Sequence, residues 1–514
     1  MSFRVEKKEG NNIYVYETRS IWNKEKKQSR QKRVYLGIKD PETGEITTPR
    51  KNRIPVFSKD YGNVYFLEKI SEKYGLVKVL SKSFPDSYNE ILALSYLDIC
   101  EENPHYIFPY WYDLSHLKNT RTMSAKQITE FMEDLGTAEE KREGFISSWV
   151  KKINKKDSGL FFDITSISTY SNEFELAEYG YNRDLESLPQ INIGVLYGQE
   201  SQLPLSYRIY QGSISDVTTL KKEIAHVKEL GIKSSMLILD RGFYSQKNIK
   251  DLVKNKLEFI IGMTMTTNLS KELIIKNCEE INDAKNAFLV ENAVMYGLKE
   301  EVEINGDKFE AFVYLDDKRK GEEKENLIRK IIEVEEKMNQ SKIKTEEDFD
   351  DLFTKRWSGL KELFNIKRNG EKFDIERNNI KIKEKTKRFG MMLIITNKKG
   401  LDFKELLLLY RQRDYIEKYF DILKNETDGN RLRSHKKEMI EGRLFVKFIT
   451  SIIFSAIYAE MRKNTLLNKY TVKELIYELK KLRIVTMSDE KHFITEISKH
   501  QREIFNAFEL QMPD

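Results

Sequence analysis

Two apolar runs in the middle of the chain each carry one acid. Residues 159–168 read Gly-Leu-Phe-Phe-Asp-Ile-Thr-Ser-Ile-Ser, which predicts a buried strand around Asp163. Residues 235–242, Ser-Met-Leu-Ile-Leu-Asp-Arg-Gly, predict a second strand that ends at Asp240. An ionised acid in such a place is costly unless a cation or hydrogen bonds satisfy it. The structural alternative for each acid alone is a strand-end aspartate that caps a turn.

The elements around these acids follow a recognisable order. Alternating and continuous apolar patterns predict strands at 188–197 and 203–210, a helix from Ser215 or Asp216, a helix at 246–254, and strands at 257–262 and 389–396. The first three strands are expected to form a meander. The predicted fold class is α/β, an RNase-H-like mixed sheet flanked by helices. A β-rich insertion interrupts it, and β and helical regions precede it.

A helix is predicted over Tyr410–Lys424, with polar and apolar residues on opposite sides. At about 100° per residue, four polar side chains fall within about 60° of one another; they are Tyr410, Arg413, Glu417 and Lys424. A carboxylate flanked by two cations and a phenol suits a metal-bound phosphate. The alternative is a solvated face with i,i+4 ion pairs, such as Arg413 with Glu417.

The three acids together point to one site. Oxygen-rich carboxylate clusters select Mg²⁺ or Mn²⁺, and two such ions can drive in-line attack on a phosphodiester. Asp163, Asp240 and Glu417 are therefore the predicted catalytic and metal-binding residues, with two ions expected.

The chain resembles the insertion-sequence DDE transposases whose third acid lies in a Y-(2)-R-(3)-E-(6)-K box, here formed by the four polar residues of the 410–424 helix. The first acid stands in Asp163-Ile-Thr165 and the second in Asp240-Arg241-Gly242-Phe243. The resemblance continues through Leu188-Pro-Gln190, Gly212–Val217, Arg431-Leu-Arg433 and Glu441–Phe445. It spans about residues 155–462 and is weaker at Tyr14–Tyr16 through Arg33.

The resemblance implies a DNA transposase that cleaves transposon ends and transfers strands into target DNA. It implies that the three acids bind ions that activate water and then a DNA 3′-hydroxyl. It also implies that Tyr410, Arg413 and Lys424 contact phosphates of the transposon end. The expected partners are terminal inverted repeats and target DNA, bound by a homodimer.

Charge and composition agree with this function without proving it. The chain has 514 residues and a net charge of only +6, so its basic residues are clustered and not spread evenly. The clusters are Lys24–Arg33, Lys381–Arg388 and Arg431–Lys437. Such clusters can follow a phosphate backbone, although lysine runs are commonly solvated loops. Arg241, Arg431 and Arg433 are further candidate DNA contacts.

Other site types are excluded or disfavoured by the residue counts. Two cysteines, Cys100 and Cys278, cannot form a thiolate zinc site or a disulfide framework. The six histidines show no metal spacing. The apolar stretch from Leu444 to Met461 contains Lys447 and Glu460, which fits a buried helix better than a membrane span. We expect a cytoplasmic protein, nucleoid-associated when bound to DNA.

We expect six segments along the chain. They are a β-rich basic region at 1–55, a helical region at 56–155, the first part of the core at 156–262, an insertion at 263–388, the second part of the core at 389–462, and a C-terminal helical region at 463–514. The basic region is either a DNA-clamping hairpin or a small β cap with a solvated loop. The paired helices after Ser124 could read DNA, although short helix pairs are common.

The insertion carries two clear local signals. Asn305-Gly306 between alternating strands predicts a hairpin, and residues 322–338 predict a helix. Trp357, between Arg356 and Ser358, is the candidate for stacking on a flipped base, although a tryptophan is more often part of a core. Two further functions stay open: a metal-dependent nuclease or resolvase on the same fold, and a domesticated DNA-binding protein without chemistry.

Overall fold

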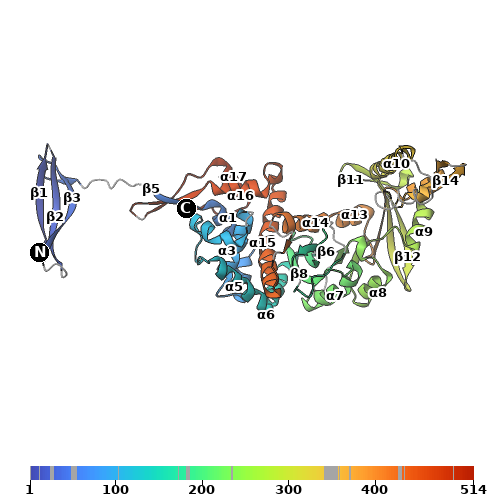
Figure 1. The fold of residues 1–514 in the computed structure, drawn as a ribbon, viewed down its shortest axis with the longest axis horizontal. Helices are drawn as coiled ribbons and strands as arrows, with labels where there is room; N and C mark the ends of the chain where they lie inside the picture. The colour runs from blue at the N-terminus through green and yellow to red at the C-terminus, as the bar shows by residue number, and fades with distance from the viewer. Residues whose placement is uncertain are drawn as a thin grey trace. The chain divides into compact units, whose positions relative to one another are not determined.

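The computed structural model describes residues 2–513 except 11, 24–27, 48–54, 102–103, 172, 181–185, 233–235, 341–352, 354–356, 358, 370–371, 427–430, 433 and 490 (Figure 1). The chain divides into two compact units. The first comprises Met1–Lys59 with Arg483–Glu496, and the second comprises Asp60–Leu482 with Ile497–Asp514. The boundaries of the six expected segments stay a prediction.

The first unit is built from antiparallel strands. One sheet has the order β1-β2-β3-β4, formed by Ser2–Glu9, Asn12–Asn23, Gln28–Lys39 and Ile46–Thr47. Another has the order β19-β18-β5, formed by His492–Ile494, Arg483–Met487 and Pro55–Asp60. Strands β1 to β4 lie within the segment for which the sequence predicts β structure. The lysines of its basic loop, Lys24, Lys26 and Lys27, lie outside the described residues.

A mixed sheet forms the centre of the second unit, in the order β11-β12-β13-β16-β10-β9-β6-β7-β8, with β17 also paired to β6. Its strands are β6 (Gly159–Thr169), β7 (Gln190–Gly198), β8 (Pro204–Gln211), β9 (Met236–Leu239), β10 (Phe259–Gly262), β11 (Ala287–Val290), β12 (Ala293–Ile304), β13 (Asp307–Leu315), β16 (Met391–Thr396) and β17 (Arg431–Leu432). The predicted meander is confirmed, because β6, β7 and β8 pair antiparallel in sequence order.

Helices lie on both faces of this sheet. On one face Phe161 meets Tyr415 of α14 (Asp414–Asp421) at 6.3 Å between ring centroids. On the other, Phe162 meets Phe243, between α7 (Asp216–Glu229) and α8 (Gln246–Lys254). Successive side chains of a strand alternate between faces. Asp163 therefore shares the face of Phe161, toward α14. The helices α13 (Phe403–Arg411) and α15 (Lys437–Lys463) contribute to the core on this face.

The first part of the predicted insertion belongs to the central sheet. The Asn305-Gly306 hairpin forms as predicted, with both residues at positive φ. Its second strand, β13, pairs antiparallel with β16, so β11–β13 extend the sheet. The local turn signal gives the hairpin, but the choice of neighbouring strand depends on packing between distant segments. The sequence alone therefore did not place this hairpin at the edge of the core.

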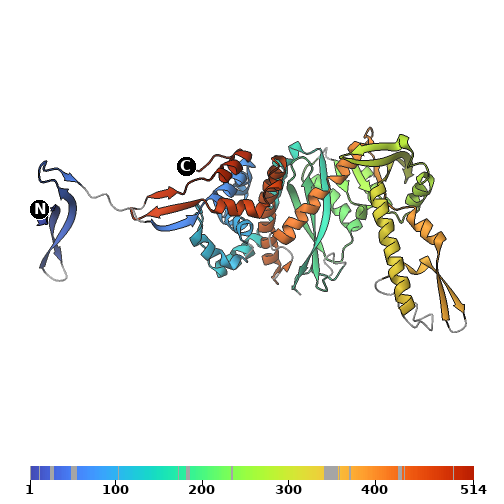
Figure 2. The same ribbon diagram turned by 90° about the horizontal axis from the view of Figure 1, so that it is seen from above.

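The rest of the insertion has its own small core. The predicted helix is present as α10 (Asp317–Gln340), and it lies beside the hairpin of β14 (Phe364–Asn369) and β15 (Lys372–Arg377) (Figure 2). Leu327, Ile331 and Val334 of α10 are buried in a cluster with Phe353 and Leu363. The other elements are α9 (Asn268–Asn277), η4 (Ala284–Asn286), η5 (Lys361–Leu363) and α12 (Asn379–Thr386).

Helices precede and follow the sheet in the second unit. They are α1 (Gly62–Lys73), α2 (Leu76–Ser83), α3 (Tyr88–Cys100), η1 (His105–Ile107), α4 (Phe108–Leu114), α5 (Ala125–Thr137), α6 (Glu139–Ile153), η2 (Asn154–Lys156), η7 (Leu466–Asn468), α16 (Val472–Lys480) and α17 (Lys499–Ala507). The predicted capping box at Ser124 is present at the start of α5. Both cysteines are free.

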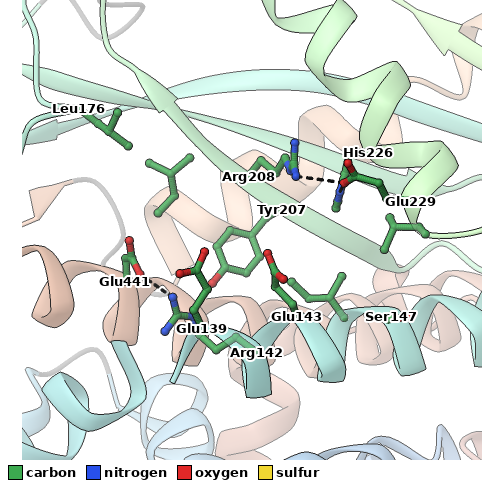
Figure 3. A pocket seen from close by; sticks show the side chains of 13 residues that line it. Glu139, Arg142, Glu143, Ser147, Leu176, Tyr207, Arg208, His226, Glu229 and Glu441 are labelled. Carbon is green, nitrogen blue, oxygen red and sulfur yellow. Dashed lines mark hydrogen bonds and ion pairs between the residues drawn. The ribbon is translucent and has the colours of Figure 1, made fainter. Parts of the chain in front are cut away.

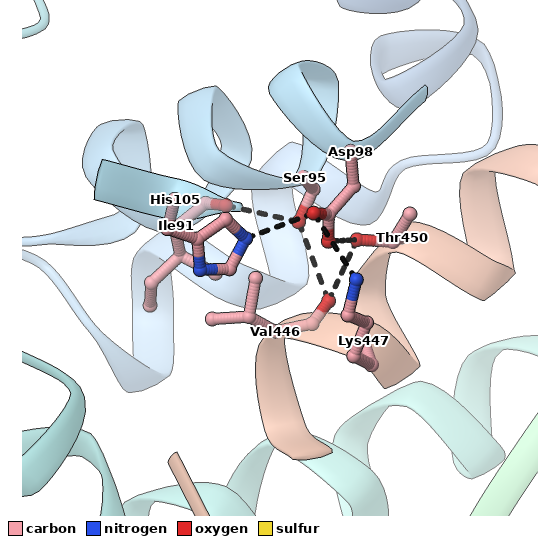
Figure 4. Close-up of polar contacts among 7 residues, drawn as sticks. All are labelled: Ile91, Ser95, Asp98, His105, Val446, Lys447 and Thr450. Carbon is pink, nitrogen blue, oxygen red and sulfur yellow. Dashed lines mark hydrogen bonds and ion pairs between the residues drawn. The ribbon is translucent and has the colours of Figure 1, made fainter. Parts of the chain in front are cut away.

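The long apolar helix α15 is buried within the protein. Among the described residues it is the one helix long and apolar enough to cross a membrane, and 83% of its most apolar window is buried. Its Lys447 lies 3.2 Å from Asp98 of α3. The Asp98 carboxylate also accepts from Thr450 at 3.1 Å and contacts His105 at 2.8 Å (Figure 4). This buried polar cluster ties α15 to α3 and η1.

A cavity of about 340 Å³ opens between α6, β8, α7 and the start of α15 (Figure 3). Two ion pairs flank it: Arg142 with Glu441 at 2.5 Å, and Arg208 with Glu229 at 3.5 Å. His226 also lines it, and burial lowers the pKa of this histidine to about 4. The candidate acids do not line this cavity. We assign it no chemistry.

Candidate active site

The strand register brings two of the predicted acids together. Strands β6 and β9 run parallel, and Phe162 pairs with Leu239. The next residues along the two strands are Asp163 and Asp240, so they start from neighbouring positions about 4.8 Å apart. Asp163 is buried, and its carboxylate accepts from the backbone N–H of Ile164 at 2.8 Å. Asp240 is the residue that directly follows β9 and precedes η3 (Arg241–Phe243).

On the neighbouring strand β10, the position level with Asp240 is occupied by a glycine, Gly262. Ile261 of β10 pairs with Leu239, which puts Gly262 level with Asp240. A Cβ at position 262 would overlap the hydroxyl of Tyr410. The missing side chain therefore leaves the space in which Tyr410 reaches Asp240, with 3.4 Å between the hydroxyl and Oδ1. Sequence reasoning missed this role, because a strand-end glycine is a common turn signal.

The sequence predicts one helix over 410–424. The structure instead has the end of α13, then α14, then a π-helical turn. α13 ends at Arg411 and α14 begins at Asp414. Between them the backbone bonds tighten to i→i+3, from Arg413 N–H to the Tyr410 carbonyl at 3.2 Å and from Ile416 N–H to the Arg413 carbonyl at 3.0 Å. Side chains three residues apart eclipse one another in such a turn. The Arg413 guanidinium accordingly lies over the Tyr410 ring, 5.3 Å from its centroid.

Arg413 connects the second and third acids. One terminal nitrogen donates to Asp240 Oδ1 at 2.5 Å, and the other donates to Glu417 Oε1 at 2.6 Å. The first nitrogen also donates to the Tyr410 hydroxyl at 3.3 Å. The i,i+4 pair between Arg413 and Glu417 that the sequence offers as the alternative is therefore present. It forms part of a larger cluster and not a solvated face, since only 13% of the Arg413 side chain is exposed.

The electrostatics place the first acid in the same cluster. Burial by itself would lower the pKa of Arg413, but Asp240, Tyr410, Asp163 and Glu417 together raise it. Burial is also the main reason that the pKa of Tyr410 rises to about 12. Arg413 stays charged and Tyr410 stays neutral at pH 7. All three acids act on one guanidinium.

Lys424 lies beyond the end of α14. It lies in a π-helical turn, η6 (Ile422–Glu426), whose i→i+5 bonds widen the helix and shift the angular position of every later residue. Its side chain is buried. The pKa of Glu186 is lowered mainly by its hydrogen bond from Arg431, and the positive charge of Lys424 adds a smaller contribution. The uniform α-helix that the sequence predicts therefore ends before this residue, and the contact of Lys424 with DNA stays a prediction.

The remaining candidate DNA contacts lie in different environments. Arg431 donates to Glu186 at 2.9 Å and to the Tyr170 hydroxyl at 3.2 Å. Arg241 is exposed directly after Asp240. Trp357 is half-buried and packs against the small core of the insertion, which favours its structural interpretation. Arg433 lies outside the described residues. DNA contacts by these side chains stay predictions.

A cavity of about 260 Å³ adjoins Arg413 and Glu417. Its far wall comes from the insertion hairpin, α10 and β16, through Met295, Tyr314, Asp316, Arg319 and Met392. Sequence reasoning missed these residues. The only available signal was the hairpin itself, which does not say which strand it joins.

Among the described residues, no group of three or more His, Cys, Asp or Glu side chains is arranged to hold a metal ion. The reason is visible at the acids: a guanidinium takes the position between Asp240 and Glu417 that a cation would take. The donor set still fits a hard divalent ion, because it consists of carboxylate oxygens, the ligands that Mg²⁺ and Mn²⁺ prefer. Arg413 Nε is buried without a hydrogen-bond partner, so its present place does not satisfy it fully.

Comparison with known proteins gives a family. No curated protein matches the chain. Seven chains of solved structures match. One is the piggyBac transposase in a synaptic complex with hairpin DNA, at 10% identity and a TM-score of 0.34, with 80% of this chain and 70% of that chain covered. The family model described as "Transposase DDE domain" matches residues 154–453, from the turn before β6 into α15. Because that match covers more than half of the sequence, this chain belongs to the transposase DDE domain family.

Proposed function

We propose that this protein is a cut-and-paste DNA transposase with an RNase-H-like core, of the insertion-sequence type with a Tyr-Arg-Glu-Lys box. The observation that carries the proposal is the position of Asp163 beside Asp240, together with the Arg413 guanidinium that donates to both Asp240 and Glu417. Neighbouring parallel strands supply two of these acids, and a helix packed on the same face of the sheet supplies the third. Family membership in the transposase DDE domain supports the same activity.

In the proposed mechanism Asp163, Asp240 and Glu417 hold two Mg²⁺ or Mn²⁺ ions. When bound, such ions would supply activation of the attacking oxygen and compensation of the charge that develops in an in-line displacement. Asp163 is fixed within the sheet, and Asp240 follows directly on a neighbouring strand, so both ligands are positioned before DNA binds. Glu417 is half-exposed at the first turn of α14 and is the ligand best placed to adjust.

The substrate follows from the cations of the same cluster. Arg413 can exchange its carboxylate partners for phosphate oxygens, for which a guanidinium has a matching bidentate geometry. We propose terminal inverted repeats and target DNA as partners, a homodimer as the assembly on DNA, and a cytoplasmic location with nucleoid association. The alternative functions are a nuclease or resolvase, which would cleave without joining, and a DNA-binding protein without chemistry.

These functions are distinguished by incubating the protein with DNA that carries the element's two ends and a supercoiled target plasmid. With Mg²⁺ we expect end cleavage and joined products, and with EDTA neither. With Ca²⁺ we expect DNA binding without chemistry, since its longer ligand distances misplace the attacking oxygen. The products are measured on sequencing gels. Cleavage without joining would identify a nuclease, and Mg²⁺-independent binding alone would leave only the DNA-binding function.

The place of Arg413 predicts competition between its guanidinium and the ions. Arg413→Gln removes one positive charge from between the acids, so we expect DNA-free protein to bind Mn²⁺ at least about tenfold more tightly, a difference of about 1.4 kcal/mol. Isothermal titration calorimetry measures the affinity.

Arg411→Gln is the matched control for the loss of charge. Arg411 lines the same cavity but contacts the Met295 sulfur at 3.7 Å in place of an acid. Equal affinities of Arg413→Gln and Arg411→Gln would contradict the competition. Absence of Mn²⁺ binding in every variant would contradict the metal site itself.

A further inference from the structure

The positive charge of the protein is concentrated in its first 39 residues. Residues 1–39 contain eleven Lys and Arg against four Asp and Glu, a net charge of +7, whereas the whole chain carries +6. The other residues together are therefore slightly acidic. A domain with this asymmetry attracts a polyanion through its local field even though the whole protein is nearly balanced.

The strand register shows which side chains share one face of the β1–β3 sheet. Directly paired residues of antiparallel strands share a face. Three rows of paired residues cross the sheet on this face: Phe3, Thr18 and Arg33; Val5, Tyr16 and Tyr35; and Lys7, Tyr14 and Ile38. We call these nine residues the tyrosine face. Its middle is aromatic and aliphatic, and Arg33 and Lys7 stand at two diagonally opposite corners.

The three tyrosines form a connected aromatic surface. The Tyr35 ring lies 5.3 Å from Tyr16 and 6.0 Å from Tyr14 between centroids. Phe3 is 52% exposed and Tyr35 is 36% exposed. Large apolar side chains that gather on one exposed sheet face indicate a binding surface.

The opposite face differs in chemistry. Rows on that face carry Arg4 with Glu17 and Val34, and Arg19 with Lys32. Its acids are used in ion pairs, Lys39 with Glu6 at 2.8 Å and Arg19 with Glu17 at 3.3 Å. Among its described residues this face has charged side chains but no cluster of aromatic rings. Aromatic rings and unpaired bases stack on one another, whereas bases within a duplex are already stacked.

We propose that the tyrosine face binds a single-stranded segment of DNA. Tyr35, Tyr16 and Tyr14 provide stacking surfaces for bases, and Arg33 and Lys7 provide cations for the phosphates on either side. The net charge of +7 selects nucleic acid over an uncharged protein partner. Lys7 pairs with Glu9 at 2.5 Å, so Arg33 is the stronger candidate of the two cations. The identification of the polymer as DNA rests on the proposed transposase function. The inference that the tyrosine face stacks on unpaired bases does not depend on that function.

The test measures binding of the full chain, in EDTA, to a fluorescein-labelled 20-nucleotide single strand and to the matched duplex by anisotropy. Stacking is worth about 1–3 kcal/mol per base, so Tyr35→Ala should weaken single-strand binding about tenfold and duplex binding less than twofold. Tyr35→Phe keeps the ring and should bind as the wild type does. Val34→Ala is the matched control, because Val34 is the adjacent, exposed residue on the opposite face.

A second pair of variants tests the phosphate contact. Arg33→Gln should lower the slope of log K against log salt for the single strand by about 0.7, and Lys32→Gln, on the opposite face, should not. Equal effects of Tyr35→Ala and Val34→Ala, equal losses on duplex and single strand, or failure of Tyr35→Phe to bind would overturn the proposal. EDTA excludes the catalytic metals, so this outcome does not depend on cleavage. If the wild-type protein joins DNA but Tyr35→Ala leaves single-strand binding unchanged, the tyrosine-face inference is overturned and the proposed transposase function is not.

Discussion

Alanine at Asp163, Asp240 or Glu417 is expected to abolish DNA cleavage and to leave DNA binding measurable. Each carboxylate is a proposed ion ligand, and each acts on the same guanidinium in the DNA-free protein. Loss of one ligand misplaces the ions that activate the attacking oxygen. We expect a decrease of at least about 10³-fold in the cleavage rate, which corresponds to about 4 kcal/mol of transition-state stabilisation.

The measurement is the single-turnover rate on end DNA in Mg²⁺, with binding measured in Ca²⁺. Asp421→Ala is the matched control, because Asp421 ends the same helix as Glu417, is 64% exposed and pairs with Lys418 at 3.6 Å. Asp163 is buried, so Asp163→Asn is measured with Asp163→Ala to separate lost charge from lost packing. Wild-type cleavage by any variant of the three acids would remove that residue from the site.

Alanine at Asp98 is expected to cause a large loss of stability. The Asp98 carboxylate, 3% exposed, faces Lys447 and Thr450 of α15 and His105 of η1 (Figure 4). Its removal leaves a buried ammonium group without its counter-charge, which costs about 3–5 kcal/mol. The free energy of unfolding from urea titrations at pH 7 measures the effect. Asp134→Ala, at an exposed site on α5, should change it by less than about 0.5 kcal/mol.

The same cluster gives a pH dependence with a defined sign. Burial by itself would raise the pKa of Asp98, but the charges of Lys447 and His105 and their hydrogen bonds lower it below its ordinary value. A lowered folded-state pKa contributes stability above the unfolded pKa of about 3.9 and loses it as the pH falls through the folded value. The difference in the free energy of unfolding between the wild type and Asp98→Ala should therefore be smallest in strong acid. A constant difference from pH 7 down to pH 2 would contradict this explanation.

Local sequence patterns determined the elements of this protein and the identity of its acids. Unbroken apolar runs gave β6 and the strand before Asp240, and the Asn305-Gly306 turn gave the β12–β13 hairpin. The apolar stripe of Leu327, Ile331 and Val334 gave α10. Such signals need only the periodicity of a strand or helix and the conformational preferences of a few turn residues. The two aspartates stood out because an acid in an apolar strand is costly without a partner.

Tertiary structure decided how those elements meet. The hairpin joins β16 and borders the acids, Gly262 leaves space for Tyr410, and the bond tightening before α14 turns Arg413 between Asp240 and Glu417. Lys424 lies in a π-helical turn after α14, where the sequence predicts a uniform α-helix. Each of these depends on contacts between residues far apart in the chain, or on a local change of helical pitch imposed by packing. The sequence by itself therefore named the acids and Arg413, whereas only the packed structure brought the Arg413 guanidinium into contact with both Asp240 and Glu417.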